Sequence, residues 1–532
     1  MDERSHWAWG LAHKFPDAQA RGQLGRLLAA VLGVLPPSPT EPVAEGDCAV
    51  RASGVAVPAS LAEVCTTDVG VRLRHTHGRS FLDQYRGFLG DFRSAPDVVA
   101  RPEDEDALVA VLRWAASAGL VVVPWGGGTS VVEGLAPREE ERRGGVVVLS
   151  LRGMNRLLAL DTVSGLAHLQ AGMTGPEVEA ALAPHGLTLR HFPQSFEFST
   201  VGLAGDAGRG HFATLYTHID ELTAGIRLRT ATGAVWESRP LPGSGAGPSP
   251  DRLVLGSEGT LGVITSGWLR VRPRPRFRAS AGVHFRSFEA AVEATRAVAQ
   301  SGLYPSGCRL LDPTEALLNQ VATDGSAVLL LAFESAHRSV RGPLEEAVRL
   351  AEAAGGRLPR PVTVQDDGEA KRDAAAATWR KAFLDGPYLQ STLISLGMAA
   401  DTFETACTWA AFPALHAAVK AAVKSAFDGR PGRLSCRFTH VYPDGPAPYY
   451  TWITPMADDV PAQWAAVKGA ASEALLAHGA TITHHHAVGR MHRPWYDRQR
   501  PEPFAEALRA ARKALDPQGI LNPGVLTDAD GG

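Results

Sequence analysis

The sequence predicts an α+β protein with two main domains, and three observations support this prediction. The chain has 532 residues, of which 45% are hydrophobic, which is enough apolar surface for two or three packed cores. A strand–helix–strand pattern over residues 97–124 is followed by short alternating segments up to residue 237. A basic stretch at 270–278, broken by two prolines, then precedes a second run of strands and Ala-rich helices.

The elements of the first half follow from local patterns. An amphipathic run at 22–35 stops at Pro36, so residues 1–90 are interpreted as a helical lead-in. A helix is predicted within 102–119 because its first residues are acidic, and an apolar strand follows at 120–124. Residues 157–172 and 221–237 alternate with a period of two, which predicts an antiparallel sheet.

The second half supplies a further domain. Strand-like runs at 327–333 and 438–442 alternate with Ala-rich helices, as expected of a separate α+β core that holds the substrate. The predicted boundaries are 1–90 for the lead-in, 91–271 for the first domain, 272–480 for the substrate domain and 481–532 for a C-terminal segment.

Charge and composition exclude several classes of protein. The formal net charge is −3, so no basic excess exists to bind nucleic acid. The five cysteines form no CxxC pair, and no stretch is long and apolar enough to cross a membrane. The N-terminus has no signal-peptide or transit-peptide pattern, so we expect a cytoplasmic protein.

The sharpest local feature is a triple-glycine turn directly after an apolar strand. It comprises Pro124, Trp125, Gly126, Gly127, Gly128, Thr129 and Ser130. Without Cβ atoms, successive backbone N–H groups can converge on an anion, and the two hydroxyls add donors. The turn therefore suits a pyrophosphate, although an ordinary glycine turn is the alternative. It lacks the lysine of a P-loop and the spacing of a Rossmann fingerprint.

Together with segments 192–202 and 256–265, in this order, the turn resembles the flavin-binding core of the vanillyl-alcohol oxidase superfamily. Within that superfamily, the sequence resembles the alkyldihydroxyacetonephosphate synthase family. The likeness includes Trp7–Gly10, His75–Ser80, Gly90–Phe92 and the three histidines at 484–486. It implies a PCMH-type FAD-binding domain of two subdomains with an α+β cap, and a C-terminal segment that packs back on the FAD domain.

The resemblance also implies a noncovalently held FAD and a set of residues that bind it. These are the seven residues of the turn together with Pro193, Gln194, Ser195, Glu197, Ser199, Thr200, Gly202, Asp206, Arg209, Glu258, Gly259, Thr260, Gly262, Val263 and Ile264. Segment 515–524 resembles the family's tail, and we assign it a structural role. No metal ion is expected.

In the cap, the resemblance implies several catalytic and substrate-binding residues. Arg309 matches an arginine that would stabilise anionic flavin or a substrate oxyanion. Tyr449 is the better match to the family's catalytic tyrosine, with Tyr450 as the alternative, and Arg437 lies on the same strand pair. His484, His485 and His486 would steer a phosphate or the leaving group. On an extended strand, His484 and His486 would share one face and His485 would take the other.

Two segments depart from the family's pattern. Gln390 stands where the family has a substrate-binding arginine, and a neutral amide cannot replace the charged fork that holds an acidic group. In the loop 206–210, a cation survives only if Arg209 reaches the expected place, and Asp206 would repel a phosphate.

Two functions are compatible with this pattern. The resemblance implies a redox-neutral exchange of an acyl for an alkyl group on a dihydroxyacetone phosphate-type substrate through an adduct at flavin N5, which is ether-lipid chemistry. The alternative is an FAD-linked oxidase or dehydrogenase of a hydroxylated small molecule, such as a 2-hydroxy acid. In both, the partner is a small molecule, either phosphorylated or lipid-like, and the oligomeric state, including a homodimer, stays open.

Overall fold

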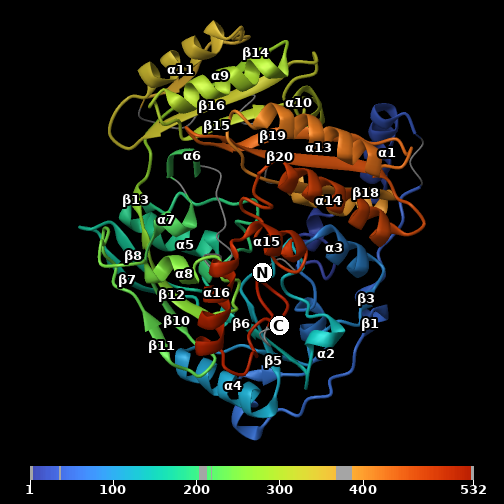
Figure 1. Cartoon of the computed structure of the whole chain (residues 1–532), viewed down its shortest axis with the longest axis vertical. Helices are drawn as coiled ribbons and strands as arrows, with labels where there is room; N and C mark the ends of the chain where they lie inside the picture. Colours follow the sequence, from blue (N-terminus) through green and yellow to red (C-terminus); the bar gives the residue numbers. More distant parts are fainter. Residues whose placement is uncertain (1–3, 35–37, 203–212, 217, 367–385, 529–532) are drawn as a thin grey trace.

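The computed structural model describes residues 4–34, 38–202, 213–216, 218–366 and 386–528. A large sheet with its helices forms the upper half of the molecule in Figure 1, and two smaller sheets form the lower half. The predicted α+β class is confirmed by this architecture and by the solved structures reported below. None of the helices in the described ranges is long and apolar enough to cross a membrane.

The first sheet of the lower domain contains the predicted strand–helix–strand unit. Its order is β2 (Cys65–Thr66), β4 (Val98–Ala100), β6 (Val146–Ser150) and β5 (Val121–Trp125), and the last three strands are parallel. Helix α4 (Glu105–Ala118) connects β4 to β5, which lie on either side of β6, because parallel strands need a crossover connection. Asp104 caps its N-terminus, and Gly119 at φ 64° ends it.

The second sheet is antiparallel, as the period of two predicts. Its order is β11 (Val235–Glu237), β10 (Thr223–Arg229), β12 (Val263–Arg270), β8 (Leu166–Gln170) and β7 (Leu157–Asp161). Side chains of both lower sheets share one apolar core. The proline-broken stretch forms β13 (Arg272–Pro273), which pairs only with β9 (Leu187–Thr188) before the chain enters the upper domain.

The upper domain is one antiparallel sheet of seven strands. Their order is β17 (Thr363–Gln365), β14 (Phe277–Phe285), β16 (Ala327–Ser335), β15 (Gly307–Leu311), β19 (Arg433–Val441), β20 (Pro446–Pro455) and β18 (Met398–Glu404). One face packs against α9 (Phe288–Gln300), α11 (Arg341–Ala353), α13 (Phe412–Ala426) and α14 (Val460–Ala477). Its other face is turned toward the lower domain (Figure 1).

The N-terminal lead-in packs on the upper domain. Helix α1 (Ala18–Leu32) begins after the cap Asp17 and ends at Gly33, so it starts four residues before the predicted run. Its Leu28 and Leu32 share a core with Met398 of β18 and Ile453 of β20. The apolar face of this amphipathic helix is therefore covered by the seven-stranded sheet of the upper domain.

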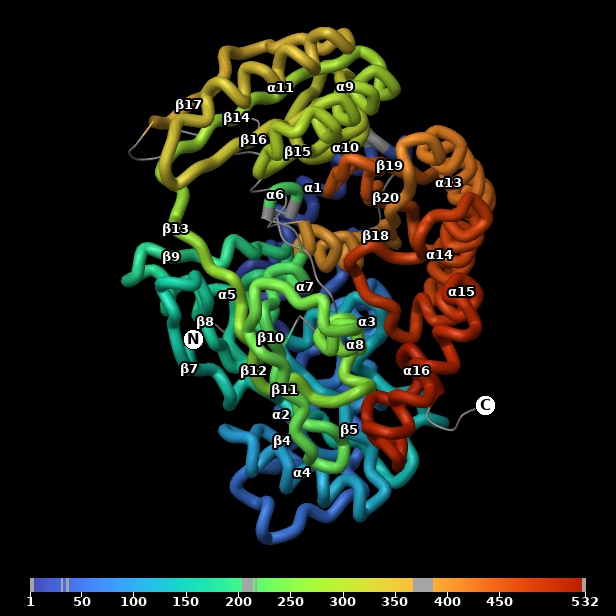
Figure 2. The backbone as a smooth tube through the Cα atoms, turned by 60° about the vertical axis from the view of Figure 1, so that its left-hand side comes forward, coloured from blue at the N-terminus to red at the C-terminus, as the bar shows by residue number. Residues whose placement is uncertain are grey.

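The C-terminal segment returns to the lower domain. Helices α15 (Arg493–Gln499) and α16 (Glu502–Leu515), red in Figure 2, run from the cap down to the parallel sheet. The Asn522 backbone N–H then donates to the carbonyl of Val122 at 2.9 Å, so the tail extends the edge of β5. The remaining elements are α2 (Val69–Arg74), α3 (Phe81–Phe88), α5 (Gly175–Leu182), α6 (Ala213–Tyr216), α7 (Ile219–Leu222), α8 (Pro250–Val254), α10 (Pro313–Leu318), β1 (Ala49–Val50) and β3 (Asp91–Phe92).

Candidate active site

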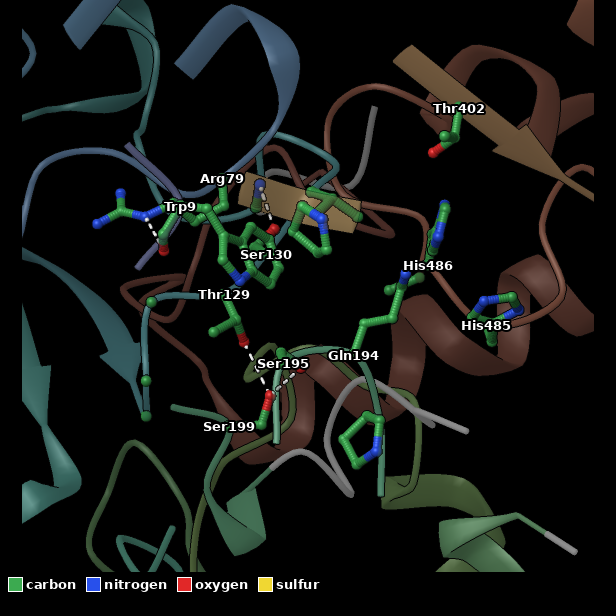
Figure 3. A pocket seen from close by; sticks show the side chains of 18 of the residues that line it. Trp9, Arg79, Thr129, Ser130, Gln194, Ser195, Ser199, Thr402, His485 and His486 are labelled. Carbon is green, nitrogen blue, oxygen red and sulfur yellow. Dashed lines mark hydrogen bonds between the residues drawn. The ribbon is translucent and has the colours of Figure 1, made fainter. Parts of the chain in front are cut away.

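A cavity of about 330 Å³ lies between the two domains (Figure 3). Its lower wall is the triple-glycine turn after β5, and its upper wall is the exposed face of β18, β19 and β20. Segment 193–202 and the three-histidine loop close its sides. Residues that are far apart in the sequence thus meet at the junction of the domains, where ligand sites commonly lie.

The three glycines permit a close approach that side chains would block. A Cβ on Gly127 would lie 1.8 Å from the carbonyl oxygen of Phe198, and one on Gly126 would lie 2.3 Å from Thr200 Oγ1. Gly128 has φ 63°, and a Cβ there would meet the ring of Trp125. The turn therefore exists in this form only with glycine, and its backbone lines the cavity.

A chain of hydroxyls lies beside this turn. Thr129 Oγ1 lies 3.2 Å from Ser199 Oγ, which in turn contacts Ser195 Oγ. Figure 3 shows the three side chains together at the lower edge of the cavity. Bare backbone next to neutral donors is the donor set that a dinucleotide phosphate requires, so these residues fit the pyrophosphate of FAD.

Glu258 joins the cavity wall to the C-terminal segment. Its carboxylate accepts the backbone N–H groups of Val488 at 2.8 Å and Gly489 at 2.9 Å. The Asn522 side chain donates to the carbonyl of Glu258 at 2.9 Å and lines the cavity as well. The tail that was assigned a structural role thus forms part of the site wall.

Most of the predicted cofactor residues line this cavity. The 18 that do are Pro124, Trp125, Gly126, Gly127, Gly128, Thr129, Ser130, Pro193, Gln194, Ser195, Ser199, Thr200, Gly202, Glu258, Gly259, Gly262, Val263 and Ile264. The structure places Glu197 elsewhere, because its carboxylate pairs with Lys14 at 2.9 Å outside the cavity. Thr260 is buried and donates to the carbonyl of Ser257. Asp206 and Arg209 lie outside the described residues.

On the cap side, strand alternation separates the two candidate tyrosines. Tyr449 is on the face of β20 toward the cavity, and its hydroxyl donates to Thr402 Oγ1 at 2.9 Å. Tyr450 is on the opposite face, fully buried in the helix-covered core, and stacks on Phe403. A substrate-binding role for Tyr450 is therefore wrong, because successive side chains of a strand point to opposite faces.

Arg437 is the cation next to Tyr449. Its guanidinium lies 3.9 Å from the centre of the Tyr449 ring, and its Nη1 donates to Glu315 Oε1 at 2.5 Å. Burial raises the pKa of Tyr449, and the charge of Arg437 opposes this rise. The Tyr449 side chain is thus a neutral phenol at pH 7. A further positive charge in the cavity, in addition to Arg437, would favour its ionisation.

Arg309 is not among the described residues that line the cavity. It lies on β15 and is buried, and burial followed by repulsion from Arg437 lowers its pKa to about 9. Arg437, which lines the cavity, lies on the neighbouring strand β19, directly opposite Leu311 of β15. Arg309 therefore lies near Arg437 but is not among the described residues that line the cavity, and its catalytic role stays a prediction.

The three histidines form a loop and not an extended strand. The carboxylate of Glu404, the last residue of β18, accepts the backbone N–H groups of His484, His485 and His486 at 2.8 to 3.1 Å. This single anchor curls the loop, so His485 and His486 both line the cavity and His484 does not. The predicted alternation, with His484 and His486 on one face, is wrong for this reason.

A chain of polar side chains leads from His485 in the cavity wall to His218 at the start of α7 in the lower domain. His485 Nδ1 lies 3.2 Å from His484 Nδ1, and His484 Nε2 lies 2.9 Å from the hydroxyl of Tyr442. The same hydroxyl lies 3.2 Å from His218 Nε2. These groups form a continuous chain in which His484 uses both ring nitrogens, an arrangement that can carry protons.

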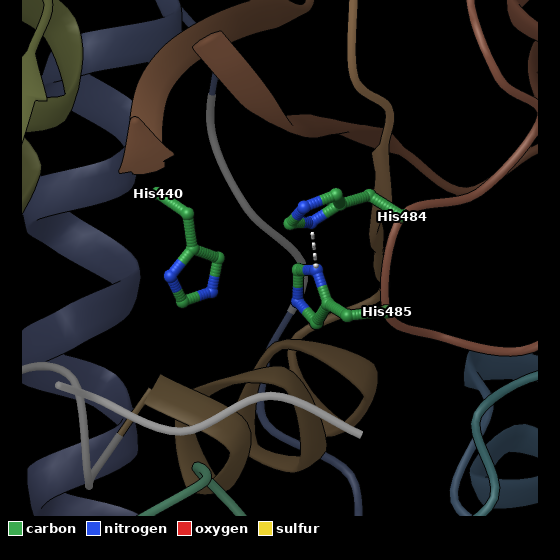
Figure 4. Close-up of side chains that lie close together, drawn as sticks. All are labelled: His440, His484 and His485. Carbon is green, nitrogen blue, oxygen red and sulfur yellow. Dashed lines mark hydrogen bonds between the residues drawn. The ribbon is translucent and has the colours of Figure 1, made fainter. Parts of the chain in front are cut away.

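The rings of His440, His484 and His485 are clustered (Figure 4). One ring nitrogen of each lies within 4.8 Å of the others, so this group of described residues has the spacing of a metal site.

Burial lowers the pKa of His486 well below its usual value, so its ring is neutral at pH 7.

Gln390 lines the cavity, but its amide is engaged within the protein. Its Nε2 donates to the carbonyl of Ala400 at 2.9 Å and to Asp401 Oδ1 at 3.2 Å, and its Oε1 accepts from Gln84. Both N–H bonds are therefore used, so the amide orders the wall of the cavity instead of offering donors to a ligand.

Sequence reasoning missed several residues of the cavity wall. Trp9, Arg79, His440, Asp401, Thr402 and Asn522 all line it. Trp9 and Arg79 belong to motifs that carry the family resemblance, which was the available signal. The others reach the cavity through strand register and the C-terminal return, which no local pattern shows.

The fold and the site define an FAD-dependent enzyme, and comparison with known proteins supports this class. Residues 96–239 match the FAD binding domain family, and residues 274–526 match the C-terminal domain of FAD linked oxidases. A glycolate oxidase subunit of Bacillus subtilis (strain 168) is 25% identical over 82% of this chain and 90% of its own length. FAD is the cofactor of this enzyme.

The chain belongs to the alkyldihydroxyacetonephosphate synthase family. The synthase of Trypanosoma brucei brucei is 30% identical over 86% of this chain and 78% of its own length, and that of Dictyostelium discoideum is 30% identical over 85% and 76%. A solved synthase structure superposes with a TM-score of 0.77 at 23% identity, covering 94% of this chain and 91% of its own. The p-cresol methylhydroxylase structure with substrate bound has a TM-score of 0.65 at 14% identity, covering 88% and 95%.

Proposed function

We propose that the enzyme forms an alkyl ether from an acyl dihydroxyacetone phosphate-type substrate and a long-chain alcohol. The bond between the substrate carbon and the ester oxygen breaks, and the acyl group leaves as a carboxylate. The alcohol oxygen bonds to the same carbon and releases its proton, so no electrons are gained or lost overall. Membership of the synthase family is the observation that carries this proposal.

FAD, when bound, supplies an electrophilic and nucleophilic ring that activates the carbon beside the ketone. The residues 126–130, 195 and 199 would hold its pyrophosphate, and segment 257–264 would pack against it. The cavity walls exclude bulk water from the reacting carbon, which strengthens every charge inside.

We propose that Tyr449 removes and returns the proton of the substrate carbon, and that Arg437 assists it. The Tyr449 hydroxyl is in the cavity wall, and the positive Arg437 over its ring favours the phenolate that a base needs. Thr402 orients the hydroxyl through the 2.9 Å bond. Arg437 is in turn fixed by Glu315, so the pair is held before substrate arrives.

The histidine chain supplies a route by which a proton can leave. His485 is in the cavity wall, and His484, Tyr442 and His218 continue the chain away from it. Glu404 holds the loop, and its own pKa stays well below the usual value, because His485 and its neighbours outweigh the effect of burial. A permanently charged Glu404 favours a positive charge on the histidines as the proton passes.

The second candidate, oxidation of a hydroxylated small molecule, is favoured by one observation. The engaged amide of Gln390 offers no positive charge where the family's substrate-binding arginine is expected. A substrate without a phosphate would then be the better fit at that wall. This candidate removes two electrons from the substrate and needs an acceptor, whereas the exchange needs none.

Product analysis separates the two candidates. The purified holoenzyme is incubated with palmitoyl dihydroxyacetone phosphate and hexadecanol, and ether product and free palmitate are quantified by mass spectrometry. The exchange predicts one palmitate for each ether formed, with no consumption of oxygen. Absence of ether product, with turnover of 2-hydroxy acids in the presence of an electron acceptor, would support the oxidation instead.

A further inference from the structure

The N-terminal strap, defined as Arg4–Leu11, lies between the two domains. Arg4 Nη1 donates to the carbonyl of Gly127 in the triple-glycine turn. The backbone N–H of Trp9 donates to Ser391 Oγ at 3.1 Å, and that of Leu11 donates to the hydroxyl of Tyr388 at 3.3 Å. The strap therefore contacts the cofactor turn at one end and the cap at the other.

The strap brings a second arginine into place beside Arg4. Arg79 Nε donates to the carbonyl of Trp9 at 3.1 Å, and its Nη1 donates to the carbonyls of His77 and Gly78. Arg79 is buried and lines the cavity, and burial lowers its pKa to about 10. Burial, followed by the positive charge of Arg79, also lowers the pKa of Arg4 well below its usual value.

Among the described residues, neither guanidinium lies within 4.0 Å of a carboxylate oxygen, although the buried carboxylate of Asp83 favours the charge of Arg79 from further away. The hydrogen bonds of Arg4 and Arg79 go to carbonyl oxygens, and the Nε and Nη2 atoms of Arg4 are buried without a hydrogen bond. The ring of Phe198, 4.5 Å from the Arg4 guanidinium, is the other contact that favours the charge. Two buried positive charges that share the single counter-charge of Asp83 are unfavourable, so this region favours a negatively charged ligand.

The bond from Arg4 also sets the direction of a peptide group. In a trans peptide the carbonyl and the following N–H point in opposite directions. Because Arg4 holds the carbonyl of Gly127 on its own side, the N–H of Gly128 is directed to the other side of the turn. Gly128 lines the cavity, so the bond directs a donor toward the place of the cofactor phosphates.

We propose that Arg4 is a cofactor-positioning residue: with Arg79 it supplies the positive charge that balances the pyrophosphate of FAD, and it orients the Gly127–Gly128 peptide toward that pyrophosphate. The proposal concerns the binding of FAD and does not depend on which reaction the enzyme catalyses. It assigns a binding function to the N-terminal strap, which would otherwise serve only to join the domains.

The test compares Arg4→Met with Arg26→Met, which removes an exposed arginine of α1 outside the site. For each variant, the Kd of FAD is measured by flavin fluorescence, and the Tm is measured with and without FAD. Arg4→Met is expected to raise the Kd about tenfold or more, since it removes a buried positive charge near the pyrophosphate and the bond that orients the Gly127–Gly128 peptide. It is also expected to leave the Tm of the apoprotein unchanged or raised, because an unbalanced buried charge has been removed.

Two results with Arg4→Met would overturn the proposal. One is a Kd of Arg4→Met within twofold of the Arg26→Met value. The other is a raised Kd of FAD together with a lower Tm of the apoprotein than in Arg26→Met. That result would mean that Arg4 only stabilises the fold. Arg4→Lys keeps the charge and provides a second test if Arg4→Met does not fold. A threefold or smaller rise in its Kd supports the charge argument, and a larger rise contradicts it.

Discussion

The guanidinium of Arg437 lies 3.9 Å from the centre of the Tyr449 ring, and both side chains face the cavity between the domains. Arg437 is on β19 and Tyr449 is directly opposite it on β20. Directly opposed residues of an antiparallel pair have their side chains on the same face, so the register of this hairpin creates the contact. The sheet thus places a cation against a phenol where a proton must be moved.

Tyr449→Phe should abolish most of the activity and leave the cofactor bound. The substitution removes the hydroxyl but keeps the ring that packs under Arg437, so turnover should fall about 100-fold or more with little change in Tm. Steady-state rates and the flavin content of the purified protein measure both effects. Tyr450→Phe is the matched control, since that hydroxyl contacts His416 in the core, and its activity should stay within about threefold. Near-normal turnover of Tyr449→Phe would remove this residue from the reaction.

Gly127→Ala should prevent FAD binding. The new Cβ would lie 1.8 Å from the carbonyl oxygen of Phe198, so the turn must move and its N–H groups lose their alignment. The ratio of flavin to protein after purification should fall at least about tenfold. Gly243→Ala, in an exposed loop with no atom within 4 Å, should keep the full ratio. A yellow Gly127→Ala protein would show that the turn does not hold the cofactor.

Gln390→Arg tests whether the engaged amide sets specificity. The longer side chain would replace an amide that contacts Asp401 and would bring a positive charge to the cavity wall. The KM for a phosphorylated substrate should fall about fivefold or more, because a charged hydrogen bond is gained. Gln390→Met, which is similar in size but neutral, should not lower it. Equal KM values for the two variants would mean that position 390 is structural.

The stability of the fold should decrease as the pH falls from about 6.5 toward 4. Burial lowers the pKa of His492 to about 4, so the unfolded chain binds a proton in this window that the folded chain does not. Each pH unit within the window costs about 1.4 kcal/mol for this group. His492→Asn retains a donor to the carbonyl of Ala487, which the ring contacts at 2.9 Å, and should reduce the slope of the free energy of unfolding against pH by the share of His492. The exposed His478→Asn should not, and an unchanged slope in His492→Asn would refute this assignment.

Much of the fold follows from periodicity in the sequence. The predicted strand–helix–strand unit is β4–α4–β5, and the alternating segments form the antiparallel sheet of β7, β8, β10, β11 and β12. The crossing at the two prolines is β13. The sequence predicts the helix of the lead-in but not its packing partner, because α1 packs on a sheet face more than 350 residues away along the chain. No local pattern shows which distant surface will cover an amphipathic helix.

The cofactor wall was predictable to a large extent because its signal is local. Glycines, small hydroxyls and their order along the chain identify it, and most of these residues line the cavity. The cap side was harder, since which side chains face the cavity depends on strand register across the sheet. The histidine loop depended on Glu404, whose carboxylate curls residues 484–486 from the end of a distant strand.

The most direct test of the account is the visible absorbance of the bound flavin during anaerobic turnover. The holoenzyme is mixed with palmitoyl dihydroxyacetone phosphate, hexadecanol is added once the spectrum is steady, and the flavin oxidation state is followed without any electron acceptor. The account predicts repeated turnover, with fully oxidised flavin recovered when the substrate is exhausted. Flavin that becomes reduced in proportion to substrate, and stays reduced until oxygen or another acceptor is admitted, would contradict it.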